Sequence, residues 1–221
     1  MYRKELTYYF ATPVAYVVIG LYLVAISLFL WVIPGEWNIV DSGYAQVDGL
    51  FRLSPWLLLF VCPALTMRLF CEERNSGTWN LLIAKKVPIW KVVWSKYLAA
   101  WTITAAAIIP TLIHFFLVSR IAEPIGNVDG GQFVGSWLGL LFLSGVFTAI
   151  GLVTASLSRS QIVGYIFGAV SSFVLYWLLL QEHYESISRG VIDFRDVLFF
   201  LSAIVICVIS TVLITNYQSK V

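Results

Sequence analysis

Charged residues are scarce in this sequence. They make up 12% of its 221 residues, whereas 60% are hydrophobic, and the mean hydropathy is +0.86. A soluble domain usually carries about 25% charged residues, so this composition excludes an ordinary water-soluble globular protein. The few charges lie between long apolar runs, as they do in proteins that have lipid as their solvent.

Cysteine is nearly absent as well. The three cysteines, Cys62, Cys71 and Cys207, lie in or beside apolar runs. An odd, buried set does not make a disulfide framework, and no CxxC or Cys/His cluster indicates a metal site. We expect these side chains to be small apolar fillers.

Motifs for nucleotide binding and catalysis are also missing. No G-x-x-x-x-G-K-[ST] loop occurs, and the glycine-rich stretch 126–131 lacks the phosphate-binding lysine. No G-x-S-x-G or H-E-x-x-H motif occurs, and His183 lies far from His114 in predicted depth. His114 could serve a proton relay, although a packing histidine is the simpler reading. We therefore predict no enzyme activity, no cofactor or metal bound by this chain, and no nucleic-acid partner.

Long apolar runs are what the sequence does have. A spanning helix needs about 20 such residues, and the runs are continuous rather than alternating, which excludes a β-barrel reading. The predicted fold is therefore an all-α integral membrane protein with six transmembrane helices, and Pro110 is expected to kink the third. The six predicted spans are residues 14–33, 55–71, 92–118, 134–157, 162–180 and 197–215.

Charge distribution predicts the orientation. Basic residues gather in the N-terminal segment and in 68–96, whereas the loops at the other ends of the spans are mainly acidic. Since cytoplasmic loops are enriched in Lys and Arg, both termini are predicted to lie in the cytoplasm of a bacterium, with the chain in its inner membrane. Charged residues are absent from mid-membrane depth, unlike in ion-coupled transporters, so the driving energy is expected to enter from outside the bundle.

Two short segments outside the spans carry helical patterns. In residues 1–13, apolar side chains recur at helical spacing, which predicts an interfacial helix; a frayed tail is the alternative. In residues 72–84, acidic residues precede Gly77, a helix-stopping residue, and Thr78 can cap a new short helix. That helix would present an apolar face to either a protein partner or the membrane surface.

The segment 72–96 resembles the loop between the second and third spans of ABC-2 type permeases. The matching positions are Glu72, Glu73, Gly77, Thr78, Leu81, Leu82, Pro88, Ser95 and Lys96. A narrower resemblance is to the permease subunit of gliding-motility ABC transporters, carried by residues 4–10, 63–68 and 126–131. The copper-maturation permease of nitrous oxide reductase is similar by the same loop. Lys85-Lys86-Val87-Pro88 departs from the family's small-residue run before proline.

The resemblance implies a role for each segment. Residues 1–13 would form the elbow helix, 72–84 the coupling helix that docks on a cytoplasmic ABC ATPase dimer, and 181–196 a short re-entrant helical loop outside. ATP and Mg would be bound by the ATPase. The implied ATPase-coupling residues are Glu72, Glu73, Gly77, Thr78, Trp79, Asn80, Leu82 and Ile83.

The implied function is that of a permease subunit that exports a substrate, linked to gliding motility or cell-surface assembly. A mechanotransmission module that passes ATPase motion to periplasmic partners is the alternative, and a scaffold without an ATPase ranks third. The sequence does not name the substrate. Membrane lipid and a second permease subunit, identical or related, are the other expected partners.

Small residues recur every four positions in two spans: Gly164, Gly168 and Ser172 in the fifth, and Gly131, Gly135 and Gly139 entering the fourth. Such stripes allow helices to approach closely in lipid. Packing within one chain is one interpretation. Because the resemblance implies that spans one and five line the contact between subunits, the fifth-span stripe is predicted to be a subunit interface.

Overall fold

The computed structural model describes residues 1–43, 46–79, 87–123, 126, 128–190 and 193–218. Every regular element in these residues is a helix. The elements are α1 (Tyr2–Ala11), α2 (Val14–Trp31), α3 (Ile39–Ser42), α4 (Asp48–Thr66), α5 (Arg68–Asn75), α7 (Ile89–Ile108), η1 (Ile109–Thr111), α8 (Leu112–Ile121), α9 (Gly130–Leu157), α10 (Gln161–Leu175), η2 (Tyr176–Leu180), α11 (Gln181–Ser188) and α12 (Phe194–Gln218).

Six stretches of the described chain are long and apolar enough to cross a membrane. They are Val14–Trp31, Asp48–Asn75, Ile89–Ile121, Gly130–Leu157, Gln161–Ser188 and Phe194–Gln218. In lipid a helix satisfies its own backbone polar groups, so apolar runs of this length fold as helices. The all-helical fold class with six spans, predicted from the sequence, is confirmed.

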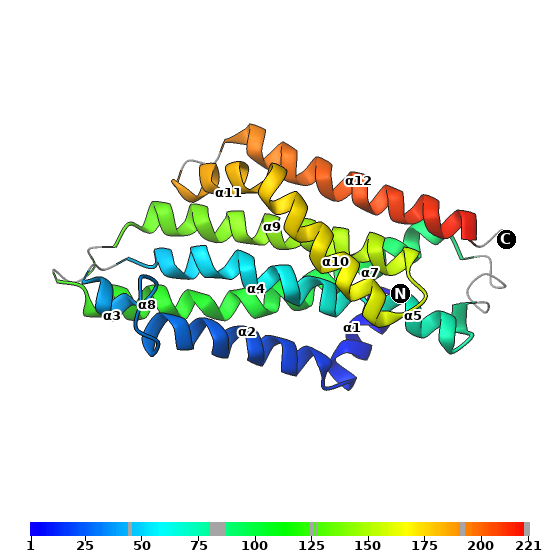
Figure 1. Ribbon diagram of the computed structural model, residues 1–221, viewed down its shortest axis with the longest axis horizontal. Coiled ribbons are helices and arrows are strands. Elements are labelled where there is room, and N and C mark those ends of the chain that lie inside the picture. The colour runs from blue at the N-terminus through cyan, green and yellow to red at the C-terminus, as the bar shows by residue number, and fades with distance from the viewer. Residues whose placement is uncertain (44–45, 80–86, 124–125, 127, 191–192, 219–221) are drawn as a thin grey trace.

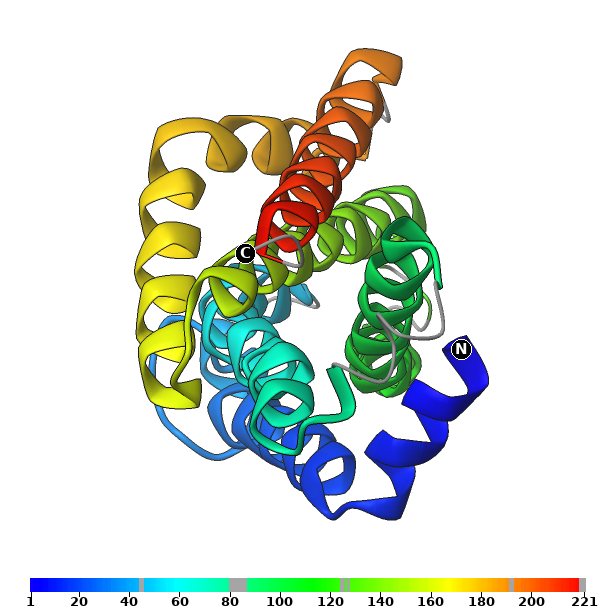
Figure 2. The ribbon, with the colours of Figure 1, turned by 90° about the vertical axis from the view of Figure 1, so that its right-hand side faces the viewer.

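The spans run side by side along the long axis of the molecule (Figure 1). α9 is central: 72% of its most apolar window is buried in the chain, against 17% for α12. Figure 2 shows α4 and α12 on different sides of α9, with α2 at the periphery. Since α2, α10 and α12 leave most of their surface uncovered, lipid or another subunit must cover them.

The two ends of the bundle differ in what they hold. One end carries the N-terminus, α1, the end of α5, the start of α7 and the end of α12; we call it the terminal end (Figures 1 and 2). The opposite end carries α3, the end of α8, the start of α9 and α11.

Several predicted boundaries shift in the structure. Span two begins at Asp48 rather than residue 55 and continues through α5 to Asn75. Span five passes through the π-helix η2 directly into α11, so the predicted short helix within 181–196 is the continuation of that span. The predicted break at Pro110 is a turn of 3-10 helix at Ile109–Thr111, as expected where proline lacks a backbone N–H.

Candidate functional site

A buried lysine joins three helices at the terminal end. Lys96, near the start of α7, is 1% exposed, and its Nζ lies 2.8 Å from Glu73 Oε1 on α5 and 3.4 Å from Glu5 Oε1 on α1. It also donates to the backbone oxygen of Leu69 at 2.9 Å and lies 5.6 Å from the Phe70 ring centroid. Three partners satisfy the three donors of the ammonium group. We call Lys96, Glu5 and Glu73 the lysine cluster.

Burial makes the lysine cluster sensitive to the loss of any member. The two carboxylates are 14% and 16% exposed, so water screens them weakly. Removing one partner of a buried ion pair leaves an uncompensated charge, which costs about 3–5 kcal/mol. The cluster therefore fixes α1, α5 and α7 relative to one another.

A second set of contacts holds α1 on α5. The Tyr8 hydroxyl donates to Glu72 Oε2, and this hydrogen bond raises the pKa of Tyr8 above its ordinary value. Tyr9, one residue further along α1, is buried and donates to the backbone oxygen of Leu65 at 2.7 Å. Glu72 also lies 3.9 Å from Arg68, but both side chains are about one-third exposed, and such surface pairs contribute about 1 kcal/mol or less.

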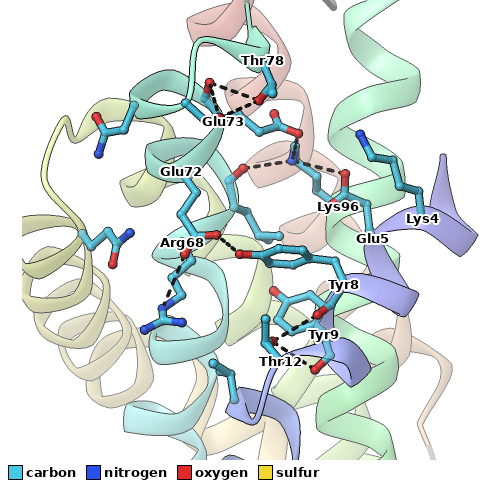
Figure 3. Close-up of a pocket in the computed structure, with 15 residues that line it drawn as sticks. Lys4, Glu5, Tyr8, Tyr9, Thr12, Arg68, Glu72, Glu73, Thr78 and Lys96 are labelled. Atoms are coloured by element: carbon cyan, nitrogen blue, oxygen red, sulfur yellow. Dashed lines mark hydrogen bonds and ion pairs between the residues drawn. The ribbon is translucent and has the colours of Figure 1, made fainter.

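A cavity of about 700 Å³ opens between α1 and α5 beside these contacts (Figure 3). Figure 3 shows the side chains of Lys96, Glu73, Glu5 and Tyr8 crossing from one helix to the next. The cavity walls are both apolar and charged, and they include Lys4, Glu5, Tyr8, Tyr9, Val14, Arg68, Leu69, Glu72, Glu73, Thr78 and Gln161. Within the described residues no group of three or more His, Cys, Asp or Glu could hold a metal ion.

A tight turn follows α5. Gly77 has a φ of +70°, the left-handed conformation that glycine supplies at helix ends. Ser76 and Thr78 hydroxyl oxygens lie 2.9 Å apart, and the Thr78 hydroxyl donates to the backbone oxygen of Glu73 at 3.3 Å. The turn therefore connects Glu73 directly to the segment that begins at Thr78. The helix-stopping role predicted for Gly77 agrees with this geometry.

The predicted ATPase-coupling residues do not all lie on one separate helix in the structure. Glu72 and Glu73 belong to α5, the extension of span two, rather than to a separate helix starting at residue 72. Trp79 is 8% exposed and packs edge-on against Phe70, with ring centroids 6.1 Å apart. Its side chain therefore anchors the loop from inside the subunit and is not free to serve as a docking anchor. Asn80, Leu82 and Ile83 lie outside the described residues.

The fifth-span stripe faces into its own subunit. A Cβ on Gly168 would lie 2.9 Å from Pro63 Cβ, and one on Gly164 would lie 3.4 Å from Ser158 Cβ. Ser172 is fully buried. The prediction of a subunit interface at this stripe therefore needs correction, because the stripe is already covered by α4 and by the end of α9.

Residues 56–183 of the chain match the family model described as ABC-2 family transporter protein. The match spans more than half of the chain. The chain belongs to the ABC-2 transporter family. No curated protein matches it significantly.

Membership in this family indicates which kind of subunit the chain forms. An ABC-2 protein is the membrane permease subunit of an ABC transporter, and the ATPase is a partner subunit. Glu72, Glu73 and Lys96 lie inside the matched region, whereas Glu5 and Tyr8 lie before it. The site thus joins the family's matched core to the N-terminal helix.

Sequence reasoning missed the lysine cluster. It placed Lys96 in the family's loop pattern but assigned it no partner, and it did not single out Glu5 for α1 docking. A usable signal was present: Lys96 is a basic residue inside an apolar helix, and such residues almost always have a partner. The identity of that partner depends on the packing of α1, which one sequence does not reveal.

Proposed function

We propose that this chain is an export permease through which a separate ABC ATPase dimer drives a substrate across the bacterial inner membrane, with the terminal end in the cytoplasm. The basic residues support this orientation, since Lys and Arg favour the cytoplasmic side. Those that lie on helices of the terminal end are Arg3, Lys4, Arg68, Arg74, Lys91 and Lys96, and Arg159 lies in the connection between α9 and α10.

The lysine cluster is the observation that carries the proposal. The resemblance implies that the coupling helix, residues 72–84, docks on the ATPase. Because Glu72 and Glu73 belong to α5, the segment that would dock begins at Thr78. Gly77 and Thr78 attach that segment to Glu73, Glu73 pairs with Lys96, and Lys96 pairs with Glu5. A displacement of the docked segment would therefore move α1, α5 and α7 together.

Span two extends this connection to the other end. It is helical from Asp48 to Asn75 apart from a turn at Met67, and 28 residues at 1.5 Å per residue reach about 40 Å. A push at Glu73 would thus arrive at the opposite end of the bundle. A second permease subunit, identical or related, would complete the pathway along the uncovered helices.

Mechanotransmission to periplasmic partners without transport is the alternative function. The same rod-like span two serves it equally well, so the two functions differ in the outcome at the opposite end and not in the coupling. Transport of a substrate in proteoliposomes that contain the ATPase supports export. ATP hydrolysis that depends on a periplasmic partner, without transport, supports the alternative.

A link to gliding motility or cell-surface assembly is a further proposal carried by the sequence resemblance.

Docking of the ATPase is tested on the loop itself. Leu82→Asp with Ile83→Asp should abolish co-purification of the ATPase, because an unpaired charge is costly to bury in an apolar interface. Val40→Asp is the matched control, since Val40 is 67% exposed at the opposite end. If the wild type, the double variant and the Val40→Asp control recovered the ATPase equally, residues 82 and 83 would not belong to the interface.

A further inference from the structure

A second cavity, of about 560 Å³, lies at the opposite end of the bundle. Its walls come from four elements: α4, α9, η2 and α11. The volume is in the range of small-molecule sites, about 300–1,000 Å³. The lining side chains combine aromatic rings, guanidinium groups, carboxylates and amides, namely Asp48, Phe51, Arg52, Trp56, Gln132, Ser136, Tyr176, Trp177, Gln181, Tyr184, Glu185, Ser188 and Arg189.

Direct contacts hold the α11 wall of this cavity in place. The Tyr184 hydroxyl donates to the backbone oxygen of Phe51 at 2.9 Å, which joins α11 to α4. The Ser136 hydroxyl donates to the backbone oxygen of Ser188 at 3.1 Å, which joins α9 to the end of α11. The cavity is therefore preformed and does not depend on a ligand to assemble it.

The charges in the cavity are of both signs, and they are not equally engaged. Asp48 accepts a hydrogen bond from Gln132 at 3.3 Å, and Glu185 accepts one from Gln181 at 2.9 Å. Arg52 and Arg189 form no ion pair with any residue that the structure describes. Two free guanidinium groups suit a phosphate, which Arg binds through parallel hydrogen bonds.

The carboxylates of Asp48 and Glu185 favour a ligand that carries a positive group beside its phosphate. A purely anionic ligand would be repelled by Asp48 and Glu185, whereas a ligand with an ammonium group beside its phosphate meets both signs. Trp56 lies 6.3 Å from Trp177 and 6.4 Å from Tyr176, centroid to centroid. Such rings attract cations through their faces. The cavity is thus complementary to a zwitterion.

An apolar surface continues from the cavity along span five. Phe173, Trp177 and Leu178 are 43%, 54% and 70% exposed. Indole rings at such a position are typical of the boundary between lipid tails and headgroups. The helix there is a π-helix, Tyr176–Leu180, a rare geometry that is frequent at functional sites. A ligand with a polar head and long apolar tails fits both surfaces.

We propose that this cavity binds the headgroup of phosphatidylethanolamine, a zwitterionic aminophospholipid. Its phosphate contacts Arg52 and Arg189, its ammonium contacts Glu185 and Asp48 near the indole of Trp56, and its acyl chains lie along α10 and η2. The orientation in the proposed function would place this cavity in the outer leaflet of the membrane. The headgroup chemistry does not depend on that orientation.

The test is competitive lipid retention, measured by native mass spectrometry of the purified full chain in detergent. With phosphatidylethanolamine and phosphatidylglycerol added together, we expect the first to be retained at least about tenfold more. Arg52→Ala with Arg189→Ala should lower that retention by about tenfold or more, because two charge-assisted contacts are lost. Arg120→Ala is the matched control, an exposed arginine of the same end that does not line the cavity.

A charge-neutralising variant separates misfolding from lost binding. Asp48→Asn with Glu185→Gln keeps shape and volume but removes the ammonium partners, so the preference should move towards phosphatidylglycerol. Preferential retention of phosphatidylglycerol by the wild type, or unchanged retention by the double arginine variant, overturns the proposal. So does displacement of the lipid by soluble glycerophosphoethanolamine at equal concentration, which would indicate a soluble ligand. None of these readouts needs the ATPase, so failure here leaves the proposed function untouched.

Discussion

The closest contacts between helices are of different kinds at the two ends of the bundle. At the terminal end, side-chain charges bridge separate helices, with Lys96 Nζ 2.8 Å from Glu73 and 3.4 Å from Glu5. At the opposite end, His183 on α11 lies 2.7 Å from Asp196 on α12, but backbone also meets backbone there: a Cβ on Gly135 would lie 2.8 Å from the backbone oxygen of Ile187 on α11. The comparison shows helices joined through buried side-chain charges at the terminal end, beside residues 72–79, and helices in direct backbone contact at the opposite end.

Removing Lys96 is expected to give the largest effect. Lys96→Met leaves Glu5 and Glu73 buried without a cation, which should lower the free energy of unfolding by about 3–5 kcal/mol. The measurement is thermal unfolding of the purified protein in detergent. Lys91→Met is the control, because Lys91 is exposed on the same helix. A melting temperature equal to that of the control would show that the lysine cluster does not hold the terminal end.

Filling the fifth-span stripe should act within the subunit. Gly168→Leu places atoms where Pro63 Cβ and Thr154 Oγ1 already lie, 2.9 and 3.0 Å from the first added carbon. Overpacking of this kind costs about 1–3 kcal/mol, so the melting temperature should fall in the isolated chain. Gly20→Leu is the control, since nothing lies within 4 Å of that position. If Gly168→Leu abolished subunit pairing but left the melting temperature unchanged, the stripe would be a subunit interface and not an internal contact.

The glycine contact at the opposite end should respond to a single methyl group. Gly135→Ala forces α9 away from Ile187 and from Gly190, whose Cα would be 2.9 Å from the new carbon. We expect about 1–3 kcal/mol of destabilisation and faster hydrogen exchange in α11. Gly20→Ala should be neutral or slightly stabilising, because alanine favours a helix. Equal exchange in α11 for both variants would mean that this end is not fixed by close approach.

The Tyr8 contact is the weakest of the set. Tyr8→Phe removes the hydrogen bond to Glu72, and we expect a loss of about 0.5–1.5 kcal/mol. Tyr16→Phe is the control, because Tyr16 is 61% exposed on α2. The readout is protease sensitivity near Thr12, since α1 should detach more often. Identical digestion of both variants would show that the Tyr8 hydrogen bond does not hold α1.

The positions of the spans could be predicted from the sequence, but the direction in which individual side chains of each span face could not. Apolar length alone locates six helices, and Pro110 and Gly77 mark a helical break and a helix end by backbone chemistry. The orientation of Trp79 and Gly168 was not predictable in the same way. Lipid is as apolar as a protein interior, so an apolar residue does not reveal whether it faces a neighbour, a partner or the membrane.

The charged contacts were hidden for another reason. Glu5 and Lys96 are 91 residues apart, and their pairing follows from the docking of α1 across the start of α7. Glu72 and Glu73 were predicted to begin a separate helix, because charges usually end a span. The structure instead continues the helix through them, since their carboxylates find Tyr8 and Lys96 as partners.

The central claim is that the lysine cluster transmits ATPase motion to the bundle. The most direct measurement is ATP hydrolysis by the partner ATPase in nanodiscs with a permease carrying Lys96→Met, Glu5→Gln and Glu73→Gln together. This triple variant leaves no charge of the lysine cluster without a partner and should keep the ATPase bound. The account predicts that permease-dependent stimulation of hydrolysis falls by about tenfold or more, an activation difference of about 1.4 kcal/mol. Stimulation equal to that of the wild type, with the ATPase bound, would contradict it.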